Sequence, residues 1–173
     1  MLLAGAVYDM SNDQMKTQFA LWAFAKAPMI LSADLNRMGN VNDTDTIASL
    51  INNPSLIAIN QDKLGHQCEE IENVNKTGQN DTLGYYVSLN EEADTEDLYF
   101  ALLIVNWYDE ALTVNTKVDF SAHGIALSSF DNCVMTNLWT NEETWVDGGE
   151  NEFPTANLAK HDHLAYKIKC SAF

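Results

Sequence analysis

The chain has 173 residues, of which 25 are acidic and 9 are basic, so its formal net charge is −16 at pH 7. This length is enough to bury a hydrophobic core in one domain or one and a half. The acidity disfavours nucleic acids and anionic membranes as partners, because both are bound through basic patches. No run of residues approaches the ~20 apolar positions of a membrane span, and residues 1–7 lack the basic start of a signal peptide.

The first predicted element is a helix that begins after Ser11. Ser11 and Gln14 have the spacing of a capping box, in which each side chain satisfies a backbone N–H of the first turn. Apolar residues recur at helical spacing from Met15 to Trp22 and cover nearly all sides, which predicts a helix buried by its neighbours. Pro28 cannot continue this helix.

The next elements alternate between strand and helix. Residues 29–31 form a short apolar run that predicts a strand buried on both faces, as in a parallel sheet. A second helix is expected from about Thr44 to Asn52, where Asn53 and Pro54 stop it, and Pro54 can open a further helical turn. The order helix, buried strand, helix indicates an α/β architecture for this part of the chain.

The composition changes near Gly65. The sequence that follows contains short β-branched and aromatic runs separated by polar turns, at residues 85–87, 98–105, 111–120, 133–139 and 163–168. Several short strands at this spacing predict an antiparallel β-sandwich. The expected domains are therefore residues 1–65 and residues 66–173.

Three glycosylation sequons suggest export from the cell. They begin at Asn42, Asn75 and Asn80, although chance occurrence in an asparagine-rich sequence is the alternative. The three cysteines are an odd number, which in a secreted chain implies a free thiol or a missing partner, and their spacing matches no zinc site. If the protein is exported, we expect its signal, and a further N-terminal part, upstream of Met1.

Several of these segments resemble one enzyme family. MLLAG, FALWAFAKAPMILSADL and NPSLIAINQDKLG resemble the C-terminal part of the barrel in glycoside hydrolase family 27, the α-galactosidases and α-N-acetylgalactosaminidases. The later runs YFALLIVN, TNLWTNEETW and HDHLAYKI resemble the family's C-terminal sandwich more loosely. The resemblance implies the last βα units of a (β/α)8 TIM barrel followed by an antiparallel β-sandwich, an α/β part joined to an all-β part.

The activity that the resemblance implies is removal of terminal α-galactose from oligosaccharides, glycolipids or glycoproteins, with retention. Such chemistry needs two carboxyl groups about 5 Å apart and neither a cofactor nor a metal ion. In the family both are aspartates on earlier barrel strands, and neither motif occurs in this sequence, so we expect this chain alone to be inactive. Asp131-Asn132-Cys133 is superficially similar to one motif but lies among the sandwich strands. The full-length protein is expected to be secreted, lysosomal or vacuolar, and a homodimer stays open.

One residue is a candidate for contact with the substrate. By the resemblance, Met1 lies where the family has a methionine beside the sugar ring; the alternative is that it is merely an initiator methionine. Two alternatives to the enzyme fragment remain, a carbohydrate-binding sandwich and a structural remnant without a ligand. The tryptophans at 22, 107, 139 and 145 are expected to pack internally rather than to stack on sugars. His161 and His163 lack a third metal ligand and are expected to be turn and strand residues.

Overall fold

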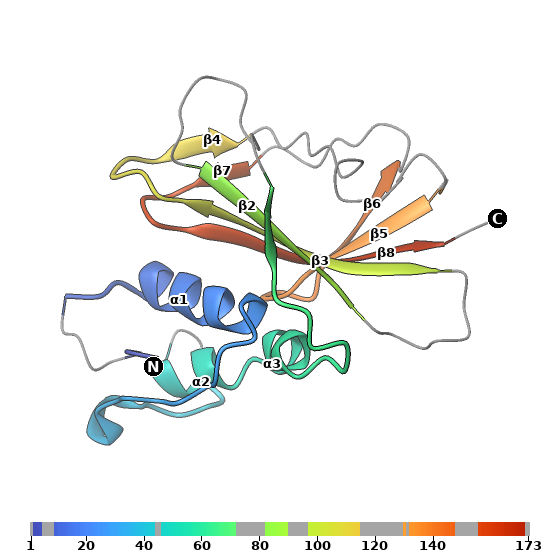
Figure 1. Ribbon diagram of the computed structural model, residues 1–173. Helices are drawn as coiled ribbons and strands as arrows, with labels where there is room; N and C mark the ends of the chain where they lie inside the picture. The colour runs from blue at the N-terminus through green and yellow to red at the C-terminus, as the bar shows by residue number, and fades with distance from the viewer. Residues whose placement is uncertain are drawn as a thin grey trace.

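The structure is a computed structural model that describes residues 2–4, 9–43, 46–71, 82–89, 97–114, 130, 132–147 and 156–171. Its centre is a six-stranded antiparallel sheet (Figure 1). Helices from the N-terminal part of the chain cover one face of this sheet, and a two-stranded sheet lies over the other face.

The first helix, α1, spans Asn12–Phe24 and confirms the predicted capping box. The Ser11 hydroxyl accepts a hydrogen bond from the Gln14 amide at 3.2 Å, and the Gln14 side chain accepts one from the Ser11 amide at 2.9 Å. Buried residues lie on several sides of the helix, as its nearly uniform apolar surface predicted. Ala25 is the C-cap of the helix, four residues before the short apolar run at 29–31.

The predicted strand at residues 29–31 is only a single parallel bridge, between Leu2 and Leu31. Leu2 donates to the Ile30 carbonyl and accepts from the Ser32 amide, both at 2.8 Å. The expected burial on both faces is wrong, because Ile30 is 62% exposed and Leu31 is 37% exposed. A parallel strand becomes buried only between neighbouring strands and covering helices, and residue 2 is the strand-like partner that the described part of the chain provides.

Short helices follow. A 3-10 turn spans Leu35–Arg37, α2 spans Ile47–Ile51 and α3 spans Pro54–Asn60. Helix α2 begins later than the predicted Thr44 because Thr46 is its N-cap, in a second capping box with Ser49. Asn53 caps α3 and Pro54 occupies its first turn, as the sequence predicted.

The strands of the large sheet come from the second part of the chain. They lie in the order β1-β2-β3-β8-β5-β6, with every neighbouring pair antiparallel. Their bounds are Glu69–Ile71, Thr82–Ser88, Leu98–Asn106, His163–Ser171, Asn132–Asn137 and Glu143–Asp147, in that order. The small sheet pairs β4, Leu112–Val114, with β7, Ala156–Leu158.

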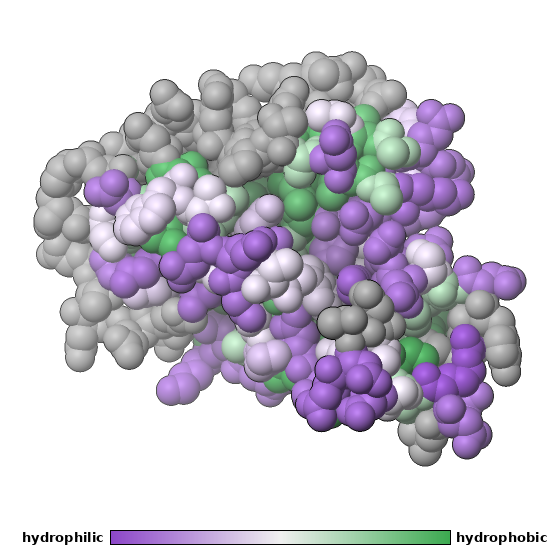
Figure 2. All heavy atoms as spheres, turned by 180° about the vertical axis from the view of Figure 1, so that it is seen from behind, coloured by the Kyte–Doolittle hydropathy of each residue, from purple (hydrophilic) through white to green (hydrophobic). Residues whose placement is uncertain are grey.

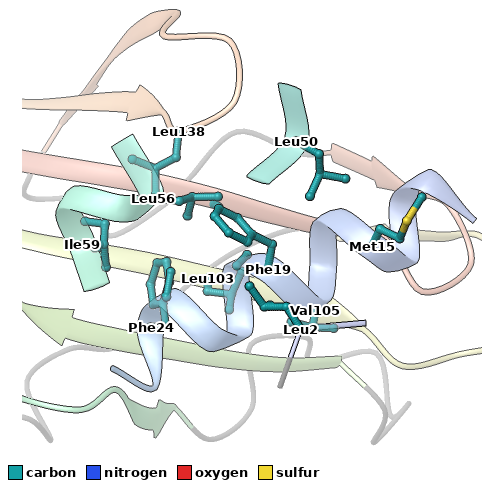
Figure 3. Close-up of a cluster of buried hydrophobic side chains, with 14 of the residues drawn as sticks. Leu2, Met15, Phe19, Phe24, Leu50, Leu56, Ile59, Leu103, Val105 and Leu138 are labelled. Carbon is teal, nitrogen blue, oxygen red and sulfur yellow. The ribbon is translucent and has the colours of Figure 1, made fainter. Parts of the chain in front are cut away.

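Strand β3 separates two hydrophobic cores, because its successive side chains point to opposite faces of the sheet. Phe100 and Leu102 face the small sheet, where they join a cluster that includes Leu158. Leu103 and Val105 face the helices and pack in a cluster with the buried side chains of α1 and α3 (Figure 3). The barrel-like helices and the helix-facing side of the large sheet therefore share the first of these two cores.

A disulfide joins neighbouring strands within the second cluster. Cys133 on β5 and Cys170 on β8 are direct register partners, and both are buried. Cys68 is a free, half-buried thiol, and burial raises its pKa. The odd cysteine count is thus resolved as one disulfide and one free thiol.

Candidate functional site

The junction between α1 and the sandwich contains a buried polar chain. His163, at the start of β8, lies with its Nδ1 2.8 Å from the Thr17 hydroxyl on α1. The indole N–H of Trp139 donates to its Nε2 at 2.7 Å, and the Thr17 hydroxyl is also 2.8 Å from the His161 carbonyl. These contacts join the turn after β5, the turn before β8 and the first helix.

The contacts determine the protonation of the imidazole. Because an indole can only donate, Nε2 must accept, and the proton of neutral His163 must lie on Nδ1. Nδ1–H then donates to the Thr17 oxygen, whose own proton is directed to the His161 carbonyl. Burial lowers the pKa of His163 from 6.5 to about 3, with a smaller contribution from the positive charge of Lys16. The histidine is therefore neutral over the ordinary pH range and acts as a structural link.

A cavity of about 540 Å³ opens beside this link. Helix α1 contributes Gln14, Gln18 and Trp22 to its wall, and the turns of the sandwich contribute Trp107 and His161. Its lining is mainly apolar, and Trp107 is 42% exposed with its side chain hydrogen-bonded to Tyr85. Apolar cavities with a few polar groups, at the junction between structural units, are where proteins commonly bind ligands or neighbouring segments.

A second hollow of about 420 Å³ lies between α3 and the large sheet. Ser55 and Ala58 line it from the helix, and Thr136, Glu143 and Lys167 line it from strands β5, β6 and β8. Its polar groups come from four separate elements. Nothing in the sequence singled these residues out, because their proximity depends on strand register.

Of the predicted site residues, Met1, Asn75 and Asn80 lie outside the described residues. Asn42 is exposed in a turn after Asn40, whose side chain accepts from the Asn42 amide at 3.0 Å. An exposed turn is where glycan attachment needs an asparagine to be. Glycosylation at all three asparagines, and substrate contact by Met1, stay predictions.

The aspartates of the N-terminal part have structural positions. Asp13 lies in the first turn of α1, where a negative charge complements the helix dipole. Asp34 accepts from the backbone of Asn36 at 3.0 Å and thereby stabilises a turn. In the Asp131-Asn132-Cys133 run, Asp131 lies outside the described residues, and Cys133 is held in the disulfide of the sandwich.

The aromatic and histidine predictions have mixed outcomes. Trp22 and Trp139 pack against the first core cluster, as expected. Trp107 and Trp145 are 42% and 72% exposed, so internal packing is the wrong interpretation for both. His161 lies in a turn with a φ of 58° while His163 begins a strand, which agrees with their predicted positions.

Two further findings bear on the class of site. Within the described ranges, no three histidine, cysteine, aspartate or glutamate side chains come together as a metal site. The helices in that same part of the chain are all too short or too polar to cross a membrane.

Comparison with known proteins matches both parts of the chain to one enzyme family. Residues 1–62 match the family model described as alpha galactosidase A, and residues 92–168 match the model of the alpha galactosidase C-terminal beta sandwich domain. The α-galactosidase of Cyamopsis tetragonoloba is 38% identical over 66 residues, which are 38% of this chain and 15% of the relative. Alpha-galactosidase A of Cellvibrio japonicus is 31% identical over 114 residues, which are 66% of this chain and 24% of the relative.

A solved structure gives the same result for the fold. The crystal structure of α-galactosidase I from Mortierella vinacea superposes with a TM-score of 0.77 at 20% identity, over 99% of this chain and 39% of the other. The chain thus spans between about a seventh and two fifths of the length of these relatives. The match to the barrel comes before the match to the sandwich along the chain. The chain therefore belongs to glycoside hydrolase family 27 and matches the C-terminal region of its members.

Proposed function

We propose that this chain is the C-terminal part of an α-galactosidase that removes terminal α-galactose from oligosaccharides, glycolipids or glycoproteins with retention. The observation that supports this proposal most strongly is the match of both family models, in order, to a chain in which α1 and α3 pack on the sandwich. In this proposal the two catalytic carboxyl groups belong to preceding barrel strands. The part described above supplies the closing helices and the sandwich that supports them.

The role of the sandwich in this proposal is to hold the end of the barrel in place. Asn53, at the start of α3, donates to the Leu138 carbonyl of the sandwich at 2.8 Å, and Thr17 reaches His163 from α1. Both contacts are buried polar links, which fix orientation more strictly than apolar packing does. A barrel whose last helices are anchored in this way presents its final strands in one position.

The location of the protein is part of the same proposal. Exposed Asn42 and the Cys133–Cys170 disulfide are both typical of proteins that pass through an oxidising, glycosylating compartment. They support secretion or delivery to a lysosome or vacuole. A homodimer is the oligomeric form that the proposal leaves open for the full-length enzyme.

The test is turnover of p-nitrophenyl α-galactoside by the purified 173-residue chain. We expect no release of nitrophenol above the rate in buffer, because a retaining glycosidase needs both of its carboxyl groups. A fusion that places the preceding barrel of the Cyamopsis relative before residue 1 is expected to release nitrophenol. Turnover by the chain alone would contradict the assignment of catalysis to other strands.

A further inference from the structure

The second hollow continues into an exposed face of the large sheet. Residues two apart on a strand share a face, so Glu143 and Trp145 on β6 lie on the same side. Across the sheet, Thr136 pairs with both Glu143 and Lys167. We call Thr136, Glu143, Trp145 and Lys167 the sheet platform. Beside it, Ser55 and Ala58 of α3 form one wall of the hollow.

Trp145 supplies the large apolar side chain of this platform, and it is 72% exposed. The residue that follows it, Val146, packs in the second core cluster, so the indole points away from the core. Its register partner Val134 is in turn paired with Lys169. The indole therefore presents a broad apolar surface to solvent on the same face as the polar hollow.

The polar groups of the platform have both signs of charge. Glu143 can only accept hydrogen bonds, Lys167 can only donate them, and the Thr136 hydroxyl does both. The Lys167 ammonium lies 5.9 Å from the centre of the Tyr99 ring, on the next strand of the same sheet. This cation–π contact lies on the side of β8 away from β5 and restrains the ammonium of Lys167, whose side chain also lines the hollow. A ligand that matches such a set needs many groups that donate and accept hydrogen bonds, and it needs no net charge.

The charges around the hollow argue against an anionic ligand. A net charge of −16 repels anions, and the hollow is lined by two carboxylates, Asp62 and Glu143, against the one ammonium of Lys167. On the face that Figure 2 shows, the coloured residues are largely hydrophilic, with smaller apolar patches. An exposed tryptophan beside mixed donors and acceptors suits the rings of a sugar, which have apolar C–H faces and hydroxyl edges.

We propose that the sheet platform is a binding site for a neutral oligosaccharide. One sugar ring stacks on the indole of Trp145, and the next extends into the hollow, where its hydroxyls contact Thr136, Glu143 and Lys167. The site uses none of the carboxyl groups of the glycosidase reaction. Its volume of about 420 Å³ is within the range of small-molecule sites.

The experiment is a titration of the ¹⁵N-labelled 173-residue chain with raffinose, cellotriose and mannotriose, followed by NMR. We expect at least one of the three to shift the signals of residues 134–136, 143–145 and 167, with saturation. Trp145→Ala is expected to weaken that binding about tenfold, because stacking covers on the order of 50 Å² of apolar sugar surface. Thr136→Val keeps the branched shape and is expected to weaken it about threefold to tenfold through loss of the hydroxyl.

Trp107→Ala is the matched control, since Trp107 is an exposed tryptophan beside the other cavity. It should leave the affinity unchanged within about twofold. Absence of binding by all three sugars, or loss of binding in the Trp107 variant alone, would overturn the proposal. So would sedimentation showing that the chain self-associates through Trp145 without binding sugar, because the face would then be a protein interface. Nitrophenyl galactoside turnover, measured in parallel, reports on the catalytic assignment separately.

Discussion

His163 makes hydrogen bonds through both ring nitrogens, so few other side chains can replace it. Its two ring nitrogens are matched to one donor and one acceptor, so an apolar replacement leaves the Trp139 indole N–H without its acceptor and the Thr17 oxygen without the Nδ1–H donor, although Thr17 keeps its bond to the His161 carbonyl. We expect His163→Leu to lower the free energy of unfolding by about 2 to 4 kcal/mol, because two buried polar groups lose hydrogen bonds. Urea unfolding followed by tryptophan fluorescence measures this change.

His161→Asn is the control for that substitution. His161 has a φ of 58°, a conformation that asparagine tolerates, and its contact with Asp109 at 3.2 Å lies at the surface. We expect a loss below about 1 kcal/mol. Equal losses in the two variants would show that the buried links contribute no more than the surface contact does.

The same histidine gives the protein a specific dependence on pH. The pKa of His163 is 6.5 when unfolded and about 3 in the fold, so the unfolded chain takes up its proton first as the pH falls. The contribution of neutral His163 is complete above 6.5 and declines below it by about 1.4 kcal/mol per pH unit, down to the folded pKa. Stability measured by urea should therefore fall between pH 6.5 and 5.

The neighbouring Asp162 has the opposite effect on stability as the pH falls, and the two effects must be measured separately. Burial raises the pKa of Asp162 above 3.8, so its protonation at low pH favours the folded state and offsets part of the loss. Comparison of the wild-type chain with His163→Leu between pH 5 and 7.5 isolates the histidine. Parallel curves for the two proteins would show that His163 does not carry the effect.

Among the elements, the pair β5 and β8 is held by a covalent bond as well as by its ladder. Cys133 and Cys170 are 37 residues apart, and closing a loop of that length in the unfolded chain corresponds to about 4 kcal/mol of stability in the chain-entropy model. We expect the double variant Cys133→Ala, Cys170→Ala to lose about 2 to 4 kcal/mol in urea unfolding. Cys68→Ala, which removes the free thiol, should lose less than about 1 kcal/mol.

Thiol counting provides an independent check on the same pair. A thiol reagent in denaturant should find one reactive thiol per chain before reduction and three after it, since the sequence contains three cysteines. Three thiols before reduction would show that the purified chain lacks the disulfide.

Local signals explain which elements could be predicted. The capping box at Ser11 and Gln14 uses residues three apart, so the sequence alone identified the start of α1 correctly. Strands β1, β6 and β7 are three to five residues long and lack a clear alternation, and they exist through pairing with strands far along the chain. The sequence therefore predicted the sandwich as a class and missed these strands.

Long-range contact also explains what was missed in the sites. Thr17 and His163 are 146 positions apart, and the residues of the sheet platform come together through the register of three strands. No spacing rule relates positions so distant. The resemblance of whole segments to family 27 identified the family, because a resemblance carries the long-range arrangement that local periodicity lacks.

At the scale of the whole molecule, the two parts differ in how completely they are enclosed. The sandwich closes its core between two sheets and the helices, whereas the run at residues 29–31 forms one bridge and leaves Ile30 and Leu31 exposed. An exposed apolar strand edge is a template for pairing between chains. The large negative charge opposes such association only at low salt, because the repulsion is screened within about 8 Å at physiological ionic strength.

Substitution at this edge tests whether it limits the solubility of the 173-residue chain. Ile30 is 62% exposed beside the Leu2 bridge, and Ile30→Lys should raise the soluble yield severalfold because a lysine at a strand edge prevents pairing with another chain. The free energy of unfolding should change by less than about 0.5 kcal/mol. The matched variant is Ile57→Lys, which makes the same change on the surface of α3, where Ile57 is 37% exposed and the backbone is already hydrogen-bonded within the helix. Light scattering at physiological salt distinguishes the two variants. If both lysines reduce aggregation equally, added polarity is sufficient and the edge has no special role. An effect confined to Ile30→Lys identifies the exposed edge at residues 29–31 as the site where chains associate.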